Sequence, residues 1–412
     1  MKRALSALLL LIGVVSTTPG FCLAPLQLLI ELTPPGSVLR PPPGTYEGPI
    51  VLKRAITLDG QGKVTIDGGG EGTVLSVKAD GAVIRGMHLT HSGDSHDRVD
   101  AGLLLEAEGT LIENNTIDDV LFGIHIRQAN NNTLRGNHVS SRGEAESLRG
   151  DGIRMWYSSD NLIQGNHFDH IRDLLFTNST DNRIIDNTVR NGRMGMEFIY
   201  SHGNWVENNR ISENRTGIVV IYSNGLTIKG NRIIHLRNPS GSGFSIKDSS
   251  QVTIKDNSIV HCAVGLIANA PVDPVNIIYL YDNLFAYNDV ALYFYGEKGG
   301  HVIHGNRFQD NFTEVLVSSP SSALANDWRG NYWDGYQGFD RGGDGVGDTP
   351  HTVHTYSDRI WRDRPMARFY RGSPMLEFID FAERLAPFSK PDLILRDPTP
   401  RVDSSAISED TF

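Results

Sequence analysis

A short phrase of apolar and polar positions recurs along most of the chain. It reads apolar residue, any residue, Gly, Asn or Asp, then Asn, any residue and a second apolar residue, as from Ile112 to Ile117. Its asparagine returns every 21 to 29 residues, a period typical of stacked structural repeats. The recurring asparagines are Asn115, Asn137, Asn166, Asn187, Asn209, Asn231, Asn257, Asn283, Asn306 and Asn331.

Between these asparagines, apolar and polar residues alternate over short stretches separated by Gly, Asn, Asp or Ser. Such alternation predicts strands, and no stretch carries the helical period that a βαβ crossover needs. If turns of about 22 residues stack, each strand pairs in parallel with its copy at about 4.8 Å. The sequence therefore predicts an all-β fold, a right-handed parallel β-helix of about 11–12 rungs over residues 25–333. One strand of most repeats opens with glycine, at Gly123, Gly152, Gly195, Gly217, Gly243 and Gly265.

Two polar stretches, residues 93–100 and 141–149, interrupt the period and are predicted to be loops on the flank of the rod. After Trp333 the pattern changes. Residues 334–355 are rich in Gly and Asp and are predicted to cap the last rung, and residues 356–390 are an Arg-rich tail with a helix from Pro374 to Ala386. Residues 391–412 are rich in Pro, Asp and Ser and are predicted to be disordered.

The first residues indicate the compartment. Lys2 and Arg3 precede an apolar run from Ala4 to about Val15 and then small and turn residues, the layout of a secretory signal peptide over residues 1–24. An uncleaved anchor helix is the alternative, but the run is shorter than the roughly 20 residues that a membrane span needs. We expect the mature chain on the far side of a membrane, and with Cys262 as its remaining cysteine it has no disulfide framework.

Net charge argues against nucleic acid as a partner. The full chain carries 38 basic and 48 acidic residues, a formal charge of −10. Removal of Lys2 and Arg3 with the signal peptide makes the chain still more acidic. A chain with this balance repels phosphate backbones, so no nucleic-acid partner is expected.

Two sets of residues could hold a metal ion. The segment from Asp340 to Asp348 places carboxylates at Asp340, Asp344 and Asp348, which are positions one, five and nine of a calcium-loop pattern, although the pattern's other ligand positions are Gly342 and His351. A Gly/Asp turn without metal is the alternative. Thioether and imidazole side chains suit Cu(I), and they gather at Met194, Met196 and His202, although Met196 follows a repeat glycine and could equally point into the core.

Carbohydrate chemistry on a β-helix needs clustered carboxylates. The one candidate group is Asp94, Asp97 and Asp100 with His96, on the first insertion. Aromatic side chains that could stack on sugars are Trp156, Tyr157, Tyr200 and Tyr222. The Tyr-Ser pairs recur at one position of the repeat, however, which favours a structural ladder.

Several stretches together resemble the NosD family, periplasmic accessory proteins of nitrous oxide reductase maturation built from carbohydrate-binding and sugar-hydrolase type β-helix repeats. They are residues 150–158, 194–204, 330–341 and 345–350, and the tail at 356–361 and 372–374. The resemblance covers nearly the whole chain after the signal peptide.

The resemblance implies a scaffold or relay with no turnover chemistry of its own. Its implied partners are an ABC-type ATPase and permease pair in the inner membrane, a copper chaperone and nitrous oxide reductase, whose copper and sulfide cluster it would help to assemble. A polysaccharide lyase or epimerase and a structural calcium-binding surface protein are the alternatives. The tail arginines are expected to sit against the permease or anionic headgroups; they are Arg362, Arg364, Arg368 and Arg371. A C-terminal cap that covers the last rung is the alternative, and both can hold for one segment.

Overall fold

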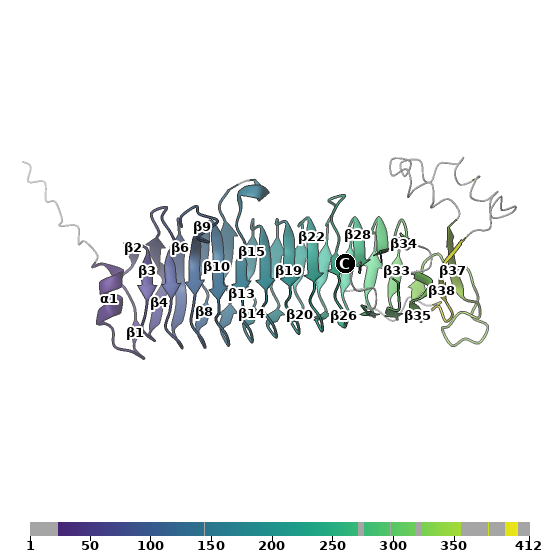
Figure 1. The fold of residues 1–412 in the computed structure, drawn as a ribbon, viewed down its shortest axis with the longest axis horizontal. Coiled ribbons are helices and arrows are strands. Elements are labelled where there is room, and N and C mark those ends of the chain that lie inside the picture. The colour runs from purple at the N-terminus through teal and green to yellow at the C-terminus, as the bar shows by residue number, and fades with distance from the viewer. Residues whose placement is uncertain are drawn as a thin grey trace, which may run out of the picture.

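The computed structural model describes residues 24–355, apart from 144, 271–275, 297 and 319–322, together with 378 and 392–402. Within them the chain winds into a straight rod of short strands, with a helix at its start and a small pair of strands at its end (Figure 1). Strands of successive turns pair in parallel along the rod. The predicted all-β, right-handed parallel β-helix is confirmed, with about 12 turns.

Two sheets form the described wall of the rod. The broad sheet takes one strand from each turn, and the bent sheet takes two, which form two parallel columns of strands. The two columns join at β4 and β6, each of which runs round the corner as a single long strand. The 12 strands of the broad sheet are β3 (Ile50–Leu52), β5 (Leu75–Val77), β7 (Ala101–Leu105), β10 (Phe122–Arg127), β13 (Ile153–Trp156), β16 (Asp173–Thr177), β19 (Met194–Ile199), β22 (Thr216–Ile221), β25 (Phe244–Lys247), β28 (Val264–Asn269), β31 (Val290–Tyr295) and β34 (Val315–Val317).

The bent sheet has 24 strands. They are β1 (Val38–Leu39), β2 (Gly44–Glu47), β4 (Thr57–Asp67), β6 (Val83–Thr90), β8 (Leu111–Glu113), β9 (Thr116–Val120), β11 (Thr133–Arg135), β12 (His138–Ser141), β14 (Leu162–Gln164), β15 (His167–Asp169), β17 (Arg183–Ile185), β18 (Thr188–Arg190), β20 (Trp205–Glu207), β21 (Arg210–Ser212), β23 (Thr227–Lys229), β24 (Arg232–Ile234), β26 (Val252–Lys255), β27 (Ser258–Val260), β29 (Ile278–Tyr281), β30 (Leu284–Ala286), β32 (Val302–His304), β33 (Arg307–Gln309), β35 (Asp327–Arg329) and β36 (Tyr332–Trp333).

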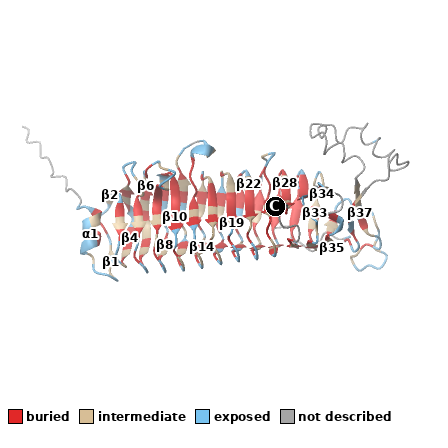
Figure 2. Cartoon of the chain, in the orientation of Figure 1, coloured by how far each residue is buried: buried red, intermediate tan, exposed pale blue. Residues whose placement is uncertain are grey.

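The core runs through the whole rod because each strand sends alternate side chains inward. In β13, Ile153 and Met155 are buried, whereas Arg154 and Trp156 face outward. Residues at like positions lie above one another, so that the rings of Phe176 and Phe198 stack with centroids 4.7 Å apart. Figure 2 shows the buried residues as a continuous column along the rod.

The recurring asparagines fasten one turn to the next at a buried corner of the bent sheet. The backbone N–H of Asn187 donates to Oδ1 of Asn209 at 2.9 Å, and its Nδ2 donates to the same oxygen at 3.0 Å and to the Ile163 carbonyl at 2.9 Å. The same pattern links Asn115 through Asn331. Because every amide inside the rod needs a partner, this ladder sets the register of the turns.

The N-terminal end of the rod departs from the prediction, which began the β-helix at residue 25. Residues Leu26–Leu32 form the helix α1, whose Leu26 and Ile30 are buried. Gln27 extends its side chain to the first strand of the broad sheet: Oε1 accepts the Val51 N–H at 3.0 Å and Nε2 donates to the Val51 carbonyl at 3.2 Å. The helix covers a sheet edge that would otherwise expose apolar side chains and unpaired amides.

The C-terminal end is closed by a segment that was predicted to be disordered. Residues Asp392–Asp397 form β38, which pairs antiparallel with β37 (His351–Thr355), and Ile394 and Leu395 are buried. The prediction of disorder for 391–412 is therefore wrong for 392–402. Ile394 and Leu395, near the start of this tail, supply burial that the overall composition did not indicate.

Candidate functional site: a charge cluster on the broad sheet

The outward side chains of the broad sheet form rows along the rod, because its parallel strands stack in register. One row passes through His125, Arg154, Leu175 and Glu197 on β10, β13, β16 and β19. Charged side chains gather around this row. We call them the charge cluster; they are Asp151, Arg154, Arg172, Asp173, Arg193 and Glu197.

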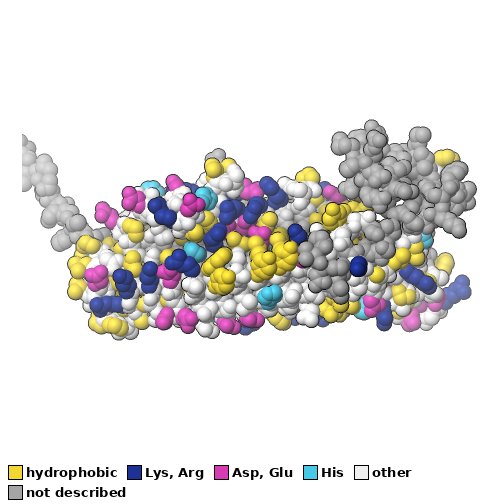
Figure 3. Space-filling view, in the orientation of Figure 1, with side chains coloured by type: hydrophobic (Ala, Val, Ile, Leu, Met, Phe, Trp, Pro, Cys, Tyr) yellow, Lys and Arg dark blue, Asp and Glu magenta, His cyan; other side chains and the backbone are white. Residues whose placement is uncertain are grey.

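The charge cluster lies on the face shown in Figure 3, where a group of basic and acidic side chains stands in the middle of the rod beside a group of hydrophobic ones. Its three carboxyl and three guanidinium groups balance in formal charge. The carboxyl groups are almost fully buried, whereas the side chains of Arg154, Arg172 and Arg193 are 31%, 24% and 37% exposed. The guanidinium groups are therefore held by buried carboxylates and remain partly exposed to solvent.

Asp173 is the centre of this arrangement. Its Oδ1 accepts hydrogen bonds from Nε of Arg193 and from the backbone N–H of Met194, both at 3.0 Å, and Arg172 lies 3.6 Å away. It stands where neighbouring turns have glycine. A Cβ at Gly217 would come within 2.4 Å of the Gly243 carbonyl oxygen, whereas the register between β16 and β19 shifts after Asp173. That irregularity coincides with the one turn here that carries a side chain at this position.

Asp151 holds the other two arginines. Its Oδ1 accepts from Nε of Arg172 at 2.9 Å and its Oδ2 from Nη1 of Arg154 at 3.2 Å. Both guanidinium groups also lie over the ring of Phe122, at 6.0 Å and 5.7 Å from its centroid. Charge-assisted bonds on one side and a ring face on the other fix the two planes.

Glu197 differs from the two aspartates because its carboxyl group is only loosely paired. The nearest guanidinium nitrogen, Nη2 of Arg193, is 3.9 Å away. Burial raises the pKa of Glu197, and the negative charge of Asp173 acts in the same direction. Glu197 is therefore the carboxyl group of the cluster that the guanidinium groups neutralise least.

His125 borders the charge cluster and gives a prediction for pH dependence. Burial lowers its pKa to about 4, with a smaller contribution from the Arg154 charge. The unfolded chain then binds a proton below about pH 6.5 that the folded chain does not bind until about pH 4, so stability falls as the pH drops through that window. Between pH 7.5 and pH 5, the free energy of unfolding of His125→Gln should therefore fall by about 1–2 kcal/mol less than that of the wild type.

The measurement is guanidinium unfolding at pH 7.5, 6 and 5 for the wild type and His125→Gln. His138→Gln serves as the matched control, because His138 is an exposed histidine on the bent sheet. A wild-type stability that is flat between pH 7.5 and 5 would contradict a neutral, buried His125.

The two insertions flank the charge cluster and bring the predicted acidic group beside it, without forming a carboxylate pair. Asp94 is exposed and pairs with Arg142 of the second insertion at 2.8 Å. Asp100 is buried, where it accepts the Ser95 N–H and pairs with Arg98. Asp97 is exposed. The second insertion contains the 3₁₀ turn η1 (Glu146–Leu148), and His96 of the first packs edge-on against Phe122.

The structure does not bring the three predicted copper ligands together. Met196 is fully buried in the core, while Met194 stands partly exposed at the start of β19. His202 lies exposed in the turn beyond that strand, and its Nδ1 accepts the Asn224 N–H at 3.0 Å. The strand alternation that points Met196 inward separates it from the exposed imidazole. These residues do not fit a copper site.

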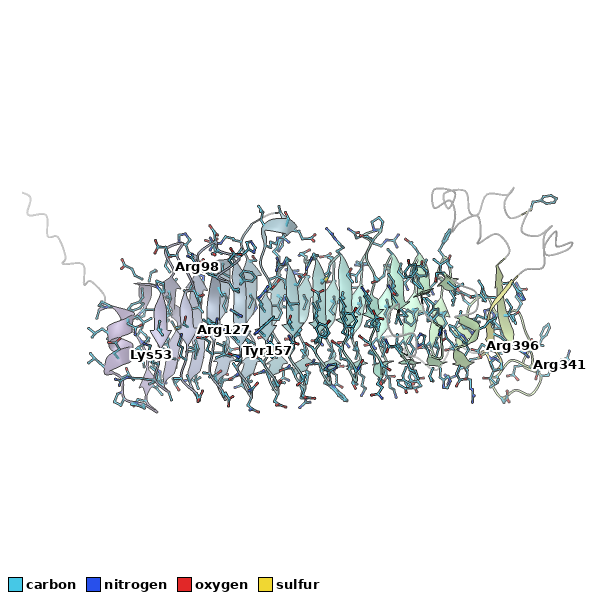
Figure 4. The ribbon with its side chains drawn as sticks, in the orientation of Figure 1. Lys53, Arg98, Arg127, Tyr157, Arg341 and Arg396 are labelled. Carbon is cyan, nitrogen blue, oxygen red and sulfur yellow. The ribbon has the colours of Figure 1, made fainter. Side chains whose placement is uncertain are left out.

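The three predicted calcium ligands are occupied by the backbone of their own loop. Asp340 accepts the N–H groups of Gly343 and Gly345 at 2.6 Å and 2.8 Å, and these bonds lower its pKa. Asp348 accepts the Arg341 N–H at 2.9 Å, and Asp344 the Val346 N–H at 3.0 Å. Arg341 marks this loop at the end of the rod in Figure 4. Among the described residues no group of three or more His, Cys, Asp or Glu is arranged to hold a metal ion.

Other predicted features fall on residues that the structure does not describe. These are the signal peptide and the tail arginines Arg362, Arg364, Arg368 and Arg371, and of the predicted helix only Phe378 is described. Within the described part of the chain, no helix has the length and apolar character for crossing a membrane.

The sequence contained a signal for the charge cluster that was not used. The glycine that opens the broad-sheet strand occurs at Gly152 and Gly195 but is missing from the turn between them, where Asp173 stands. A charged residue at a position that is glycine in most neighbouring turns distinguishes this turn from the others.

The fold and the cluster define a class of protein: a parallel β-helix with a partly exposed charge cluster on its broad sheet. Two family models match the chain. One, described as right handed beta helix region, matches residues 63–204, and the other, described as periplasmic copper-binding protein (NosD), matches residues 137–338. The second range contains the whole charge cluster.

A curated relative from Pseudomonas aeruginosa, named probable ABC transporter binding protein NosD, is 28% identical over 358 residues, which are 84% of this chain and 83% of the relative. A protein of the same name from Stutzerimonas stutzeri is 31% identical over 110 residues, 26% of this chain and 25% of that protein. The chain is thus similar to the NosD family, and the match to the family model covers just under half of its length.

Solved structures share the fold alone. A family 28 exopolygalacturonase from Yersinia enterocolitica aligns with a TM-score of 0.57 at 13% identity, covering 77% of this chain and 76% of that one. A mannuronic acid specific polysaccharide family 6 lyase from human gut microbiota aligns with a TM-score of 0.51 at 14% identity, covering 69% and 84%. These similarities confirm the parallel β-helix and carry no activity over to this chain.

Proposed function

We propose that this chain is a periplasmic accessory protein of an ABC transporter that helps to assemble the copper and sulfide cluster of nitrous oxide reductase. The observation that carries the proposal is the NosD match over residues 137–338, together with an alignment to a relative named as an ABC transporter binding protein over 84% of the chain. The proposed partners are the ATPase and permease pair in the inner membrane, a copper chaperone and the reductase.

The geometry supports a scaffold. The rod is closed at both ends, by α1 and by the β37–β38 pair, so it does not extend itself by adding strands. Its sides offer a long surface on which guanidinium groups are already fixed by Asp151 and Asp173. Donors held in place before binding lose little entropy when a protein docks, which suits recognition of a folded client.

Copper enters this proposal as cargo. The described methionines other than Met194, which are Met87, Met155 and Met196, are buried in the core. Three of the four described thioether groups, which are the soft ligands that Cu(I) prefers, are thus turned away from the surface. We assign the handling of copper to the partner proteins and the positioning of those partners to the rod.

The test is deletion of the gene in a host that makes active nitrous oxide reductase. The purified reductase should lack its catalytic copper cluster and its activity, and the wild-type gene should restore both. Fully copper-loaded, active reductase from the deletion strain would overturn the proposal. Turnover of a uronan or pectin-like polymer by the purified chain, abolished by Glu197→Gln, would assign it instead to carbohydrate-active enzymes.

The same strain tests the transporter contact proposed for the tail. Replacement of Arg362, Arg364, Arg368 and Arg371 by alanine should reduce reductase copper content as strongly as the deletion. The matched control removes the same charge from exposed arginines of the described rod, namely Arg183, Arg210, Arg341 and Arg396. Equal effects of the two sets would show that the tail has no special role.

A further inference from the structure

Tyrosines recur at the corner where the broad-sheet strands end. The corner residue of each of these turns has a positive φ: 47° at Tyr157, 50° at Tyr200 and 49° at Tyr222. Other turns place Gln128, Asn178 and Asp248 there. A left-handed backbone suits Asn, Asp and Gly and is strained for a bulky ring.

The strained rings add little to the fold. Tyr157 and Tyr200 are 53% and 51% exposed. The residue after each corner is a buried serine that links the turns: the Ser158 N–H donates to Oγ of Ser179 at 3.2 Å, and the Ser179 N–H to Oγ of Ser201 at 3.1 Å. The expectation of a structural ladder is therefore met by the serines. Strained and exposed side chains that a fold does not need point to binding.

Asn178 interrupts the column of rings. Corner positions two turns apart are separated by about 10 Å, twice the strand spacing, so Tyr157 and Tyr200 stand about that far apart with a short side chain between them. Tyr200 stacks on Tyr222 at 5.2 Å and 10°, which leaves its other face toward Asn178. The Asn178 amide makes no side-chain hydrogen bond within the described part of the chain.

Aromatic and charged side chains surround Tyr157. The Trp156 ring is 41% exposed and packs edge-on against Tyr157 at 5.1 Å. Figure 4 shows Tyr157 beside Arg127 on the face of the broad sheet. That arginine is paired with Glu106, and Arg154 of the neighbouring row is paired with Asp151. The cations around the rings are thus neutralised, which disfavours an anionic ligand.

We propose that Tyr157, Asn178 and Tyr200 form a binding subsite for one pyranose ring of a neutral glycan. The sugar lies between the two tyrosine rings with its apolar faces against them, and the Asn178 amide donates to and accepts from its hydroxyl or N-acetyl groups. Trp156 and Tyr222 contact the neighbouring sugar units. The subsite binds without turnover and does not depend on the transporter function proposed above.

The test is isothermal titration of the full chain with the tetramer of β-1,4-linked N-acetylglucosamine. Tyr157→Asn and Tyr200→Asn should each weaken binding by about tenfold or more, and both should fold well because asparagine tolerates positive φ. Asn178→Tyr should abolish binding by filling the gap between the rings.

Tyr287→Asn is the matched control, because Tyr287 is also exposed and has a φ of 55° at a different corner. It should leave binding unchanged. No heat of binding with the wild type, or an equal loss in Tyr287→Asn, overturns the subsite. Tighter binding of a mannuronate tetramer than of the neutral tetramer overturns the assignment to neutral sugars.

Discussion

Replacing Asp173 by alanine is expected to lower the free energy of unfolding by about 3–5 kcal/mol. The change removes the acceptor of the Arg193 Nε and Met194 N–H bonds and leaves Arg193 without its close partner. Asp173 is 1% exposed, so water cannot replace the lost carboxylate without opening the sheet. The cost comes from the two lost hydrogen bonds, because bonds to a charged group contribute about 1.5–3 kcal/mol each.

Two variants separate this effect from general damage. Asp173→Asn keeps an acceptor for the Met194 N–H but loses the charge, and it should fall between the wild type and Asp173→Ala. Asp169→Ala is the surface control, since Asp169 pairs with Arg190 of the next turn at 2.7 Å near the solvent, and it should cost at most about 1 kcal/mol. Guanidinium unfolding measures all three, and equal losses for Asp169→Ala and Asp173→Ala would contradict a buried, coupled cluster.

The fold could be predicted because one residue type, a buried asparagine, recurs at the same corner of each turn. Each turn must satisfy the amides at the same buried corner, and Asn187 does so with the same three bonds as its counterparts. A period of asparagines with strand alternation between them leaves few other folds. The ends lack this periodic signal, so the helix at Leu26–Leu32 and the strand at Asp392–Asp397 were missed.

The candidate site was harder to predict because its chemistry depends on which face a side chain occupies. Met196 and Glu197 are adjacent in sequence. Met196 lies in the core, whereas Glu197 lies on the outer face of the broad sheet. Ordinary strand alternation separates the two, and the register shift after Asp173 means that the alternation of one turn cannot be copied directly onto the next. Met194, Met196 and His202 therefore looked like neighbours in sequence and are separated in the fold.

Replacing Asp397 by alanine is expected to open the C-terminal end of the rod and to cost about 2–4 kcal/mol. Its Oδ2 accepts the Asn331 N–H at 3.1 Å, the Asn331 Nδ2 at 2.9 Å and the Trp333 Nε1 at 3.1 Å, and the side chain is fully buried. Each earlier asparagine accepts from the asparagine of the turn before and donates to the asparagine of the turn after, as Asn209 does between Asn187 and Asn231. The last position needs only an acceptor, which a carboxylate supplies.

The readouts for Asp397→Ala are local and global. Trp328 and Trp333 are buried at this end, so their fluorescence should shift to the red as water enters, and backbone amides of the last turns should exchange faster than those near Asn187. Asp327→Ala is the matched control, because Asp327 is partly exposed and pairs with Arg329 and His304 on the surface. In stacked repeats each turn is stabilised mainly by contacts with its neighbours. A uniform rise in amide exchange along the whole rod would therefore contradict a terminal cap and show instead that Asp397 stabilises the whole solenoid.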